Sequence, residues 1–229
     1  MCGRYALIVD AEELAAIFDG IELPSLAPVA PRYNIAPSQP APVVRHADGG
    51  GFEWAELTWG LIPSFSRDGR GHINARSESA AQKPTFRSAF RKRRCLIPAS
   101  GFYEWQAIPD EKRKQPYFIH RKGQAPFCFA GLWERWGDVD SFAILTTDAC
   151  ESLESIHHRM PVMLTRESFN AWLDPDAEPA AVQELLQPFP SDQVEAYTVS
   201  SYVNSPKNNS AQCVTKAPPI EPGAGTLFG

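Results

Sequence analysis

The chain has 229 residues, a hydrophobic content of 43% and a formal net charge of −5. No central stretch resembles a linker, so we expect one domain with ample apolar residues for a core. The absence of a run of about 18 apolar residues argues against a membrane span, and the first twenty residues lack a secretory signal, so we expect a cytoplasmic protein.

The first predicted elements are a short strand and a helix. Residues 5–9 form an apolar, strand-like run, and Asp10 followed by AEELAAIF predicts an N-capped helix. Many prolines follow, at positions 24, 28, 31, 37, 40 and 42, and predict an irregular but packed loop.

Strands outnumber helices in the rest of the chain. Alternating or continuous apolar runs predict strands at 53–62, 94–98, 102–106, 116–120, 127–136, 142–147, 161–165 and 194–200. Helical patterns fit 76–82, 85–92, 150–156, 166–173 and 179–186, with Pro179 at a first helical position. The strands are not separated by regular helical crossovers, which predicts an α+β fold: a single domain with a curled, mostly antiparallel, barrel-like sheet and short helices around it. We place this domain at residues 1–217 and expect a disordered tail at 218–229.

The cysteines indicate neither a zinc site nor a disulfide framework. There are five of them, an odd number without a CxxC pair. Cys95 and Cys128 lie in apolar runs, which predicts buried structural thiols. Glycine-rich nucleotide loops and the HExxH motif are absent, and we expect neither a cofactor nor a metal ion.

Positive charge is concentrated in two segments although the chain is acidic. No acidic residue occurs between Glu78 and Glu104, a stretch that contains Lys83, Arg87, Arg91, Lys92, Arg93 and Arg94. A second cluster comprises Lys112, Arg113, Lys114, Arg121 and Lys122. Such clusters can attract phosphates locally, and they can equally form a solvated face.

Cys2 is a candidate nucleophile because of its position. Removal of Met1, which is common before a small side chain, leaves an α-amine with a pKa of roughly 7.7–8.0 beside a thiol of roughly 8.5. This 1,2-aminothiol suits an aldehyde, since the amine forms an imine and the thiol then closes a thiazolidine ring. The alternative is that Cys2 belongs to a disordered start of the chain.

Three further segments carry candidate site residues. Glu104 lies in the aromatic stretch GFYEW, where apolar surroundings would raise its pKa toward a role in proton transfer. His157 in IHHRMP can transfer protons near neutral pH. Asn74 and Arg76 in HINARSES can orient a substrate and hold a phosphate. Taken singly, these residues also fit a water-facing strand edge, a surface histidine and a helix cap.

Together these segments resemble the SRAP family (SOS-response-associated peptidase), which comprises abasic-site processing proteins. The matching motifs are MCGRY at the start, PRYNIAPSQ at 31–39, WGLIPSF at 59–65, INARSES at 73–79, RCLIPASGFYEW at 94–105, ILTTDA at 144–149 and HHRMPVML at 157–164. They follow the family order over nearly the whole chain and leave only the tail uncovered.

The resemblance implies a reversible covalent crosslink between Cys2 and abasic sites in single-stranded DNA. It implies that Asn74 holds the adduct, that Glu104 is the general acid/base for formation and reversal, and that His157 assists ring opening of the sugar. It further implies phosphate contacts by Arg4, Arg76 and Arg159, a pocket position for Thr146, and a wedge or stacking surface at Pro37 and Phe65. A monomer that acts in the DNA damage response, without contact to a membrane, and that is found at the nucleoid when crosslinked is expected on the same basis.

The chain departs from the family pattern at two positions. Phe65 stands where the family usually has Trp, so we expect weaker stacking on DNA. His158 stands where the family often has Asp or Asn. The spacing to Arg159 and Met160 selects His157 as the catalytic histidine, and the second imidazole can alter its pH dependence.

Two other functions use overlapping residues. An N-terminal-nucleophile peptidase, acting on its own first residue, would also use Cys2 with its amine as base. A non-covalent reader of modified DNA would need basic and aromatic residues but not Cys2. Strand cleavage by β-elimination, a lyase reaction, is a further possible activity of such a site.

Overall fold

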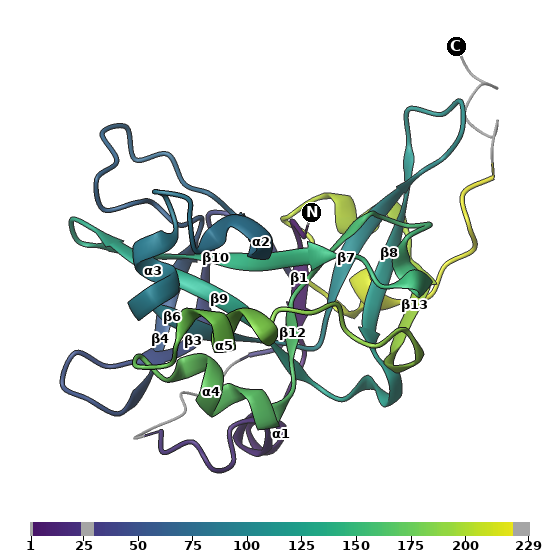
Figure 1. Cartoon of the computed structure of the whole chain (residues 1–229). Helices are drawn as coiled ribbons and strands as arrows, with labels where there is room; N and C mark the ends of the chain where they lie inside the picture. Colours follow the sequence, from purple (N-terminus) through teal and green to yellow (C-terminus); the bar gives the residue numbers. More distant parts are fainter. Residues whose placement is uncertain (1, 24–29, 222–229) are drawn as a thin grey trace.

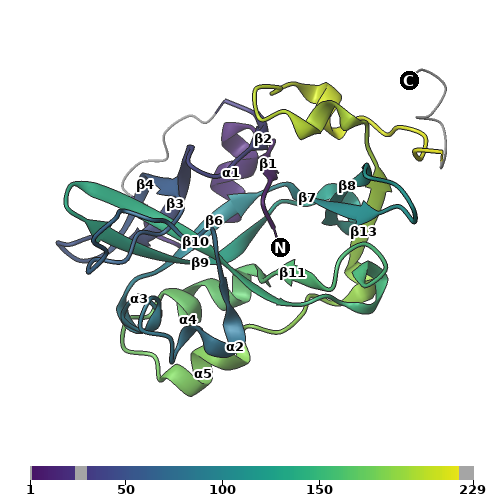
Figure 2. The ribbon, with the colours of Figure 1, turned by 90° about the horizontal axis from the view of Figure 1, so that it is seen from above.

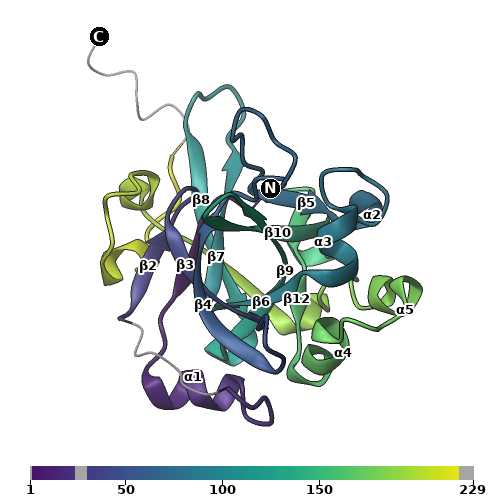
Figure 3. The ribbon, with the colours of Figure 1, turned by 90° about the vertical axis from the view of Figure 1, so that its left-hand side faces the viewer.

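Five strands of the larger sheet close into a barrel. The computed structural model describes residues 2–23 and 30–221 (Figure 1). The ring consists of β4 (Phe52–Trp59), β3 (Pro40–His46), β6 (Arg94–Ala99), β9 (Phe127–Trp136) and β10 (Val139–Asp148), and β10 pairs with both β9 and β4. Figure 3 looks along the opening of this ring. Most pairings are antiparallel, so the prediction of an α+β fold with a barrel-like core is confirmed.

A second sheet of five strands lies beside the barrel. Its order is β13 (Val194–Thr198), β8 (Lys114–Arg121), β7 (Gly101–Ala107), β1 (Tyr5–Leu7) and β2 (Arg32–Ile35). Only Ser100 separates β6 of the barrel from β7 of this sheet. Seen from above, the start of the chain lies between the two sheets (Figure 2).

Short strands extend the large sheet toward the second one. β5 (Asn74–Arg76) runs parallel to β10, and β11 (Arg159–Pro161) runs antiparallel to it. β12 (Met163–Leu164) pairs with β9. The predicted strand at 161–165 is therefore two short strands with different partners.

Aromatic side chains fill the space between the sheets. Tyr5 contacts Trp59 and Phe129 edge to face, with ring centroids 5.3 and 5.6 Å apart. All six residues of β6 are buried, because helices cover the outside of the barrel at this strand. Cys95 and Cys128 lie in this core as free thiols, which confirms their prediction.

The helices are short and lie around the barrel. They are α1 (Ala11–Ile17), α2 (Ser77–Ala80), α3 (Arg87–Lys92), α4 (Phe169–Leu173) and α5 (Pro179–Glu184). Single 3-10 turns occur at η1 (Lys122–Gln124), η2 (Glu151–Leu153), η3 (Arg166–Ser168), η4 (Ser191–Gln193), η5 (Ser201–Asn204) and η6 (Ala211–Val214). Asp10 caps α1 in a capping box with Glu13, and Pro179 is the first residue of α5, as predicted.

Two predicted helices are shorter than expected. The segment 76–82 begins as a strand, since Arg76 pairs with Thr146 of β10 before α2 starts. The segment 150–156 contains only η2 as regular helix. In both cases pairing of the neighbouring backbone with β10 limits the length of the helix.

The proline-rich loop prediction was wrong at residues 32–35 and 40–46, which form β2 and β3. β3 pairs with β4 along its whole length, but with β6 only at Val44 and Arg45. At Pro40 and Pro42 the strand therefore has one hydrogen-bonded neighbour, and the missing N–H on the other side carries no cost. Of the six prolines, Pro24 and Pro28 lie outside the described residues.

The described chain ends at residue 221. Within the predicted tail, Ile220 N–H donates to Gln115 Oε1 at 2.6 Å. The rest of that tail, 222–229, and the predicted removal of Met1 concern residues outside the described part. None of the helices in residues 2–23 and 30–221 has the length and apolar character needed to span a membrane.

Candidate active site

Cys2 is anchored between the two sheets. It precedes β1, which pairs with β7 so that Tyr5 lies opposite Phe102. The Cys2 thiol donates to the Arg4 carbonyl at 3.8 Å, and the Asn74 amide donates to the Cys2 carbonyl at 2.8 Å. β1 thus ties Cys2 to the small sheet, and Asn74 ties it to β5 of the large sheet.

Glu104 lies on the strand beside Cys2. Continuing the β1–β7 register by two residues places Gly3 opposite Glu104. The Glu104 side chain is buried, and this burial raises the pKa of its carboxyl group. Burial also raises the pKa of the Cys2 thiol, and the nearby Glu104 charge raises it further. Both groups therefore favour their protonated, uncharged forms.

His157 is held by the backbone of β11. The Arg159 N–H lies 3.0 Å from His157 Nδ1, and the Arg159 carbonyl lies 3.1 Å from the same atom. A backbone N–H can only donate, so the neutral ring accepts at Nδ1 and carries its proton on Nε2. Burial lowers the pKa of His157, and the charge of Lys114 lowers it further. Lys114 also acts on Glu104, so the three side chains share one electrostatic environment.

His158 stacks on His157 within the same turn. Their ring centroids are 4.5 Å apart with an interplanar angle of 22°, and His158 is exposed. The charge of His158 is a further cause of the lowered pKa of His157. A proton on the outer ring therefore disfavours a proton on the inner one.

Gln106 connects the strand of Glu104 to the segment of His157. Its amide donates to the Ser155 carbonyl at 2.8 Å, and its Oε1 accepts from the Tyr117 hydroxyl at 3.0 Å. Sequence reasoning missed Gln106. The available signal was its position two residues after Glu104, which puts both side chains on the same face of β7.

The three arginines predicted to hold phosphates differ in how far their donors are already used. Arg4 is half-buried, and its guanidinium donates to Asn34 Oδ1 at 2.8 Å and to the Val203 carbonyl at 2.9 Å. Arg159 is buried and donates to Glu78, to Asp148 and to the Thr146 carbonyl at 2.5–3.0 Å. Arg76 is exposed and makes no side-chain hydrogen bond or ion pair with any residue in the described part of the chain.

Two polar oxygen atoms at the site have no partner among the described residues. They are Asn74 Oδ1 and Thr146 Oγ1, both inaccessible to solvent, and Thr146 is itself completely buried. Thr146 lies opposite Arg76 in the β5–β10 ladder. A buried oxygen without a partner is costly, and a bound hydroxyl, amine or water would satisfy it.

Pro37 and Phe65 lie in loops at one end of the barrel. Pro37 is half-buried in the β2–β3 turn, where Ser38 N–H donates to the Trp59 carbonyl at 2.8 Å. Phe65 follows β4 in the loop 60–73 and is 64% exposed, which is unusual for a large apolar side chain. An exposed ring of this kind is available for stacking.

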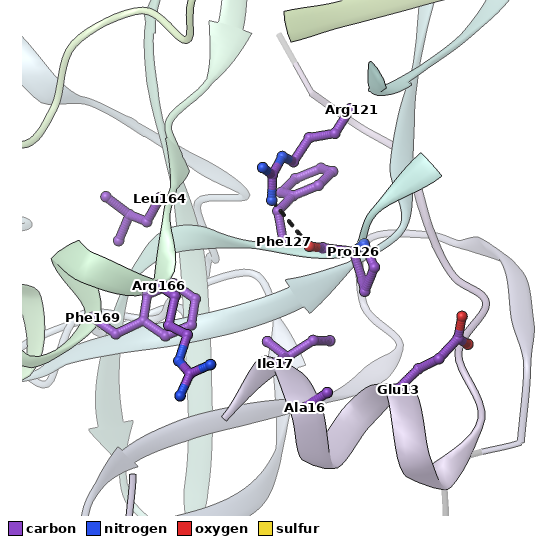
Figure 4. Close-up of a pocket in the computed structure, with 9 residues that line it drawn as sticks. All are labelled: Glu13, Ala16, Ile17, Arg121, Pro126, Phe127, Leu164, Arg166 and Phe169. Carbon is purple, nitrogen blue, oxygen red and sulfur yellow. Dashed lines mark hydrogen bonds between the residues drawn. The ribbon is translucent and has the colours of Figure 1, made fainter. Parts of the chain in front are cut away.

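A separate apolar pocket lies at the other end of the molecule. It has a volume of about 280 Å³ and is lined by residues of α1, β9, β12 and α4, together with Arg121 and Arg166 (Figure 4). None of the predicted site residues lines it. Among the described residues no three or more His, Cys, Asp or Glu side chains are grouped to hold a metal ion.

Comparison with known proteins identifies the family. The model of the family described as SOS response associated peptidase (SRAP) matches residues 1–206. The chain belongs to this family, as its motifs indicated.

Relatives occur in bacteria and vertebrates. The abasic site processing protein YoqW of Bacillus subtilis is 41% identical over 223 residues, which cover 93% of this chain and 99% of YoqW. The abasic site processing protein HMCES of Pongo abelii is 31% identical, over 80% of this chain and 64% of HMCES. A solved structure of a protein from Bacteroides thetaiotaomicron, 28% identical, superimposes with a TM-score of 0.81 over 94% of this chain and 100% of that one.

Proposed function

We propose that this chain processes abasic sites in single-stranded DNA by forming a covalent crosslink through Cys2. The relatives named abasic site processing proteins support the general role. The observation that carries the chemistry is the position of Cys2, held by Asn74 and lying beside the buried Glu104. In an abasic site the open sugar presents an aldehyde, which is the electrophile that a 1,2-aminothiol takes up.

The raised thiol pKa orders the steps of the proposed reaction. Once Met1 is removed, the free amine attacks the aldehyde first, because the buried Cys2 thiol stays protonated near neutral pH. Loss of one water gives the imine. The sulfur then adds to the imine carbon while the thiol proton leaves and the imine nitrogen gains a proton, which closes the thiazolidine ring.

Glu104 is suited to move these protons. A carboxyl group with a raised pKa exchanges protons closer to neutral pH than an exposed one does. It can accept the thiol proton during ring closure and return it during ring opening, which makes the crosslink reversible.

His157 and the polar oxygens would handle the sugar. The neutral ring of His157 carries its proton on Nε2, which can donate to the ring oxygen of the closed sugar as that ring opens. Asn74 Oδ1 and Thr146 Oγ1 lack partners among the described residues and can bond the hydroxyl or amine groups of the adduct. Pro37 and Phe65 would hold the neighbouring bases, Arg76 would contact a phosphate directly, and Arg4 and Arg159 would do so by exchanging internal partners.

Self-removal of Met1 is a second proposed activity of the same site. The description of the family as a peptidase supports it. It would use the Cys2 thiol on the preceding peptide bond and would not exclude the crosslink. Intact mass measurements on wild type, Cys2→Ala and Glu104→Gln test it: retention of Met1 in both variants supports self-processing, and its removal in all three proteins contradicts it.

The crosslink is tested with single-stranded DNA that carries one abasic site. We expect a band that survives denaturing electrophoresis with wild type and is absent with Cys2→Ala. Cys2→Ala keeps the α-amine, so borohydride should trap its imine and restore a shifted band. This control shows that the variant is folded and still binds the lesion. A wild type that lacks Met1 and gives no stable band would refute the proposal.

A further inference from the structure

The charge that the site leaves available is too small for a long polyanion. Arg4 and Arg159 spend their donors on protein carbonyls and carboxylates, which leaves Arg76 as the exposed cation of the predicted three within the described residues. Binding to a nucleic acid strand depends on neutralising several phosphates. Further cations are therefore to be sought beyond the three arginines.

The chain that follows Arg76 supplies them. Lys83, Arg87, Arg91 and Lys92, here called the α3 patch, are all exposed, and no side-chain hydrogen bond or ion pair links them to other described residues. Their neighbours are different: Arg93 pairs with Glu134 at 2.6 Å, and Arg94 is buried and donates to backbone carbonyls. The structure thus divides the basic segment into used and unused charges.

The members of the α3 patch form a row on one side of the helix. Arg87 N–H donates to the Lys83 carbonyl at 2.8 Å, so the helical turn begins at Lys83 and the spacing 83, 87, 91 places three cations on one face. At the rise of an α-helix this row is about 12 Å long. Arg87, Ser88, Arg91 and Lys92 line a hollow of about 430 Å³. Like charges at this spacing disfavour the helix, which argues against a purely structural purpose.

The α3 patch also belongs to the same rim as the exposed aromatic ring. His72 of the loop that contains Phe65 packs edge to face on Phe86, the residue before α3, with ring centroids 5.6 Å apart. α2 starts directly after Arg76, and it lies nearer than α3 to the start of β1 in both Figure 1 and Figure 2. A strand that leaves Arg76 or stacks on Phe65 would therefore meet the α3 patch next.

We propose that the α3 patch binds the sugar–phosphate backbone of the DNA strand that flanks the abasic site. The inference rests on the proposed function and extends it: Arg76 contacts the lesion's own phosphate, and the α3 patch adds affinity that depends on the length of the flanking strand. The contact is to phosphates, so it is independent of base sequence.

The test compares Arg87→Gln/Arg91→Gln with a matched control, Lys122→Gln/Arg166→Gln. The control removes the same charge from the end of the molecule where α1 lies. Each protein reacts with single-stranded DNA carrying an abasic site within five nucleotides or within twenty-five. We expect equal crosslinking rates for all proteins on the short strand. On the long strand, wild type and control should react faster than on the short one, and the α3 variant should lose this gain.

Salt dependence gives the size of the effect. Loss of two phosphate contacts lowers the slope of log affinity against log salt by about 1.4 for a single strand, or about sevenfold over a fourfold rise in salt. Fluorescence anisotropy with undamaged DNA of the same length measures this slope without any covalent step. The readout therefore remains valid even if the proposed crosslink fails.

The outcomes separate the two proposals. An α3 variant with the length effect and the salt slope of wild type overturns the α3 patch while leaving the crosslink intact. Loss of the length effect in both double variants also overturns it, because the effect would then be one of net charge. DNA with its flank only 5′ or only 3′ of the lesion assigns the direction of the strand, and a variant that loses neither flank contradicts the proposal.

Discussion

Replacing Glu104 by Gln should stabilise the protein while it slows the reaction. In the unfolded chain Glu104 has an ordinary pKa of roughly 4.3, and burial raises that pKa in the fold. The native state therefore binds this proton more tightly than the unfolded state does. Stability falls as the pH rises from the unfolded pKa through the folded pKa, and the loss is complete above the folded pKa.

The size of the effect follows from the same linkage. Each unit of raised pKa costs about 1.4 kcal/mol of stability above the folded pKa, and Gln removes this cost. For a chain of this length, 1 kcal/mol corresponds to a shift in Tm of roughly 2–4 °C. The crosslinking rate should fall roughly 10²–10⁴-fold, as is typical when a general acid/base is lost.

Thermal unfolding at pH 4 and pH 8 measures the stability change. The Tm of Glu104→Gln minus that of wild type should be positive at pH 8 and should shrink toward zero at pH 4. Glu56→Gln, an exposed Glu on β4, is the control and should show no such trend. A difference that is independent of pH, or a less stable variant at pH 8, would refute the reasoning because the buried carboxylate would then be favourably bonded in the native state.

Three further predictions separate binding, chemistry and stability. Arg76→Gln should weaken DNA binding without a change in Tm, whereas Arg159→Gln should cost about 1.5–3 kcal/mol of stability by removing hydrogen bonds to charged groups; urea unfolding and anisotropy distinguish them, and the reverse pattern would contradict the assignment of used and unused donors. Gln106→Ala should slow crosslinking and shift its pH profile, since the His157 segment loses its tether, while DNA affinity stays constant; an unchanged profile would show that Gln106 has no part in positioning. Phe65→Ala should reduce affinity about 5- to 150-fold, the equivalent of about 1–3 kcal/mol for one stacked base, whereas Phe65→Trp should increase it, and equal affinities for all three proteins would exclude stacking.

Local signals in the sequence located much of the fold. The apolar run at 127–136 coincides with β9, and the capping box at Asp10 marks the start of α1. These features depend on residues close together in the chain. β2 and β3 were missed because their prolines argue against strands, and only their barrel neighbours make an unpaired N–H unnecessary there.

The sequence also contained the chemistry of the candidate site but not its assembly. The residue types and their order identified Cys2, Glu104, Asn74 and His157, and the resemblance to the family connected them. That Asn74 holds the Cys2 carbonyl, 72 residues away, follows only from the junction of the two sheets. Gln106 had no motif of its own, because its role comes from contacts across β8 and the His157 segment.

The sequence by itself determined which groups are present, that the chain forms one sheet-rich domain, and that its basic residues cluster. The tertiary structure decided which of those charges remain available. Arg159 meets Glu78 across 81 residues, and Arg4 meets the Val203 carbonyl across 199, so both are engaged within the protein. Arg76 and the α3 patch have no such partners among the described residues. The physical reason is that an ion pair or hydrogen bond depends on proximity in space, and a charge read from the sequence carries no information about the group that the fold brings next to it.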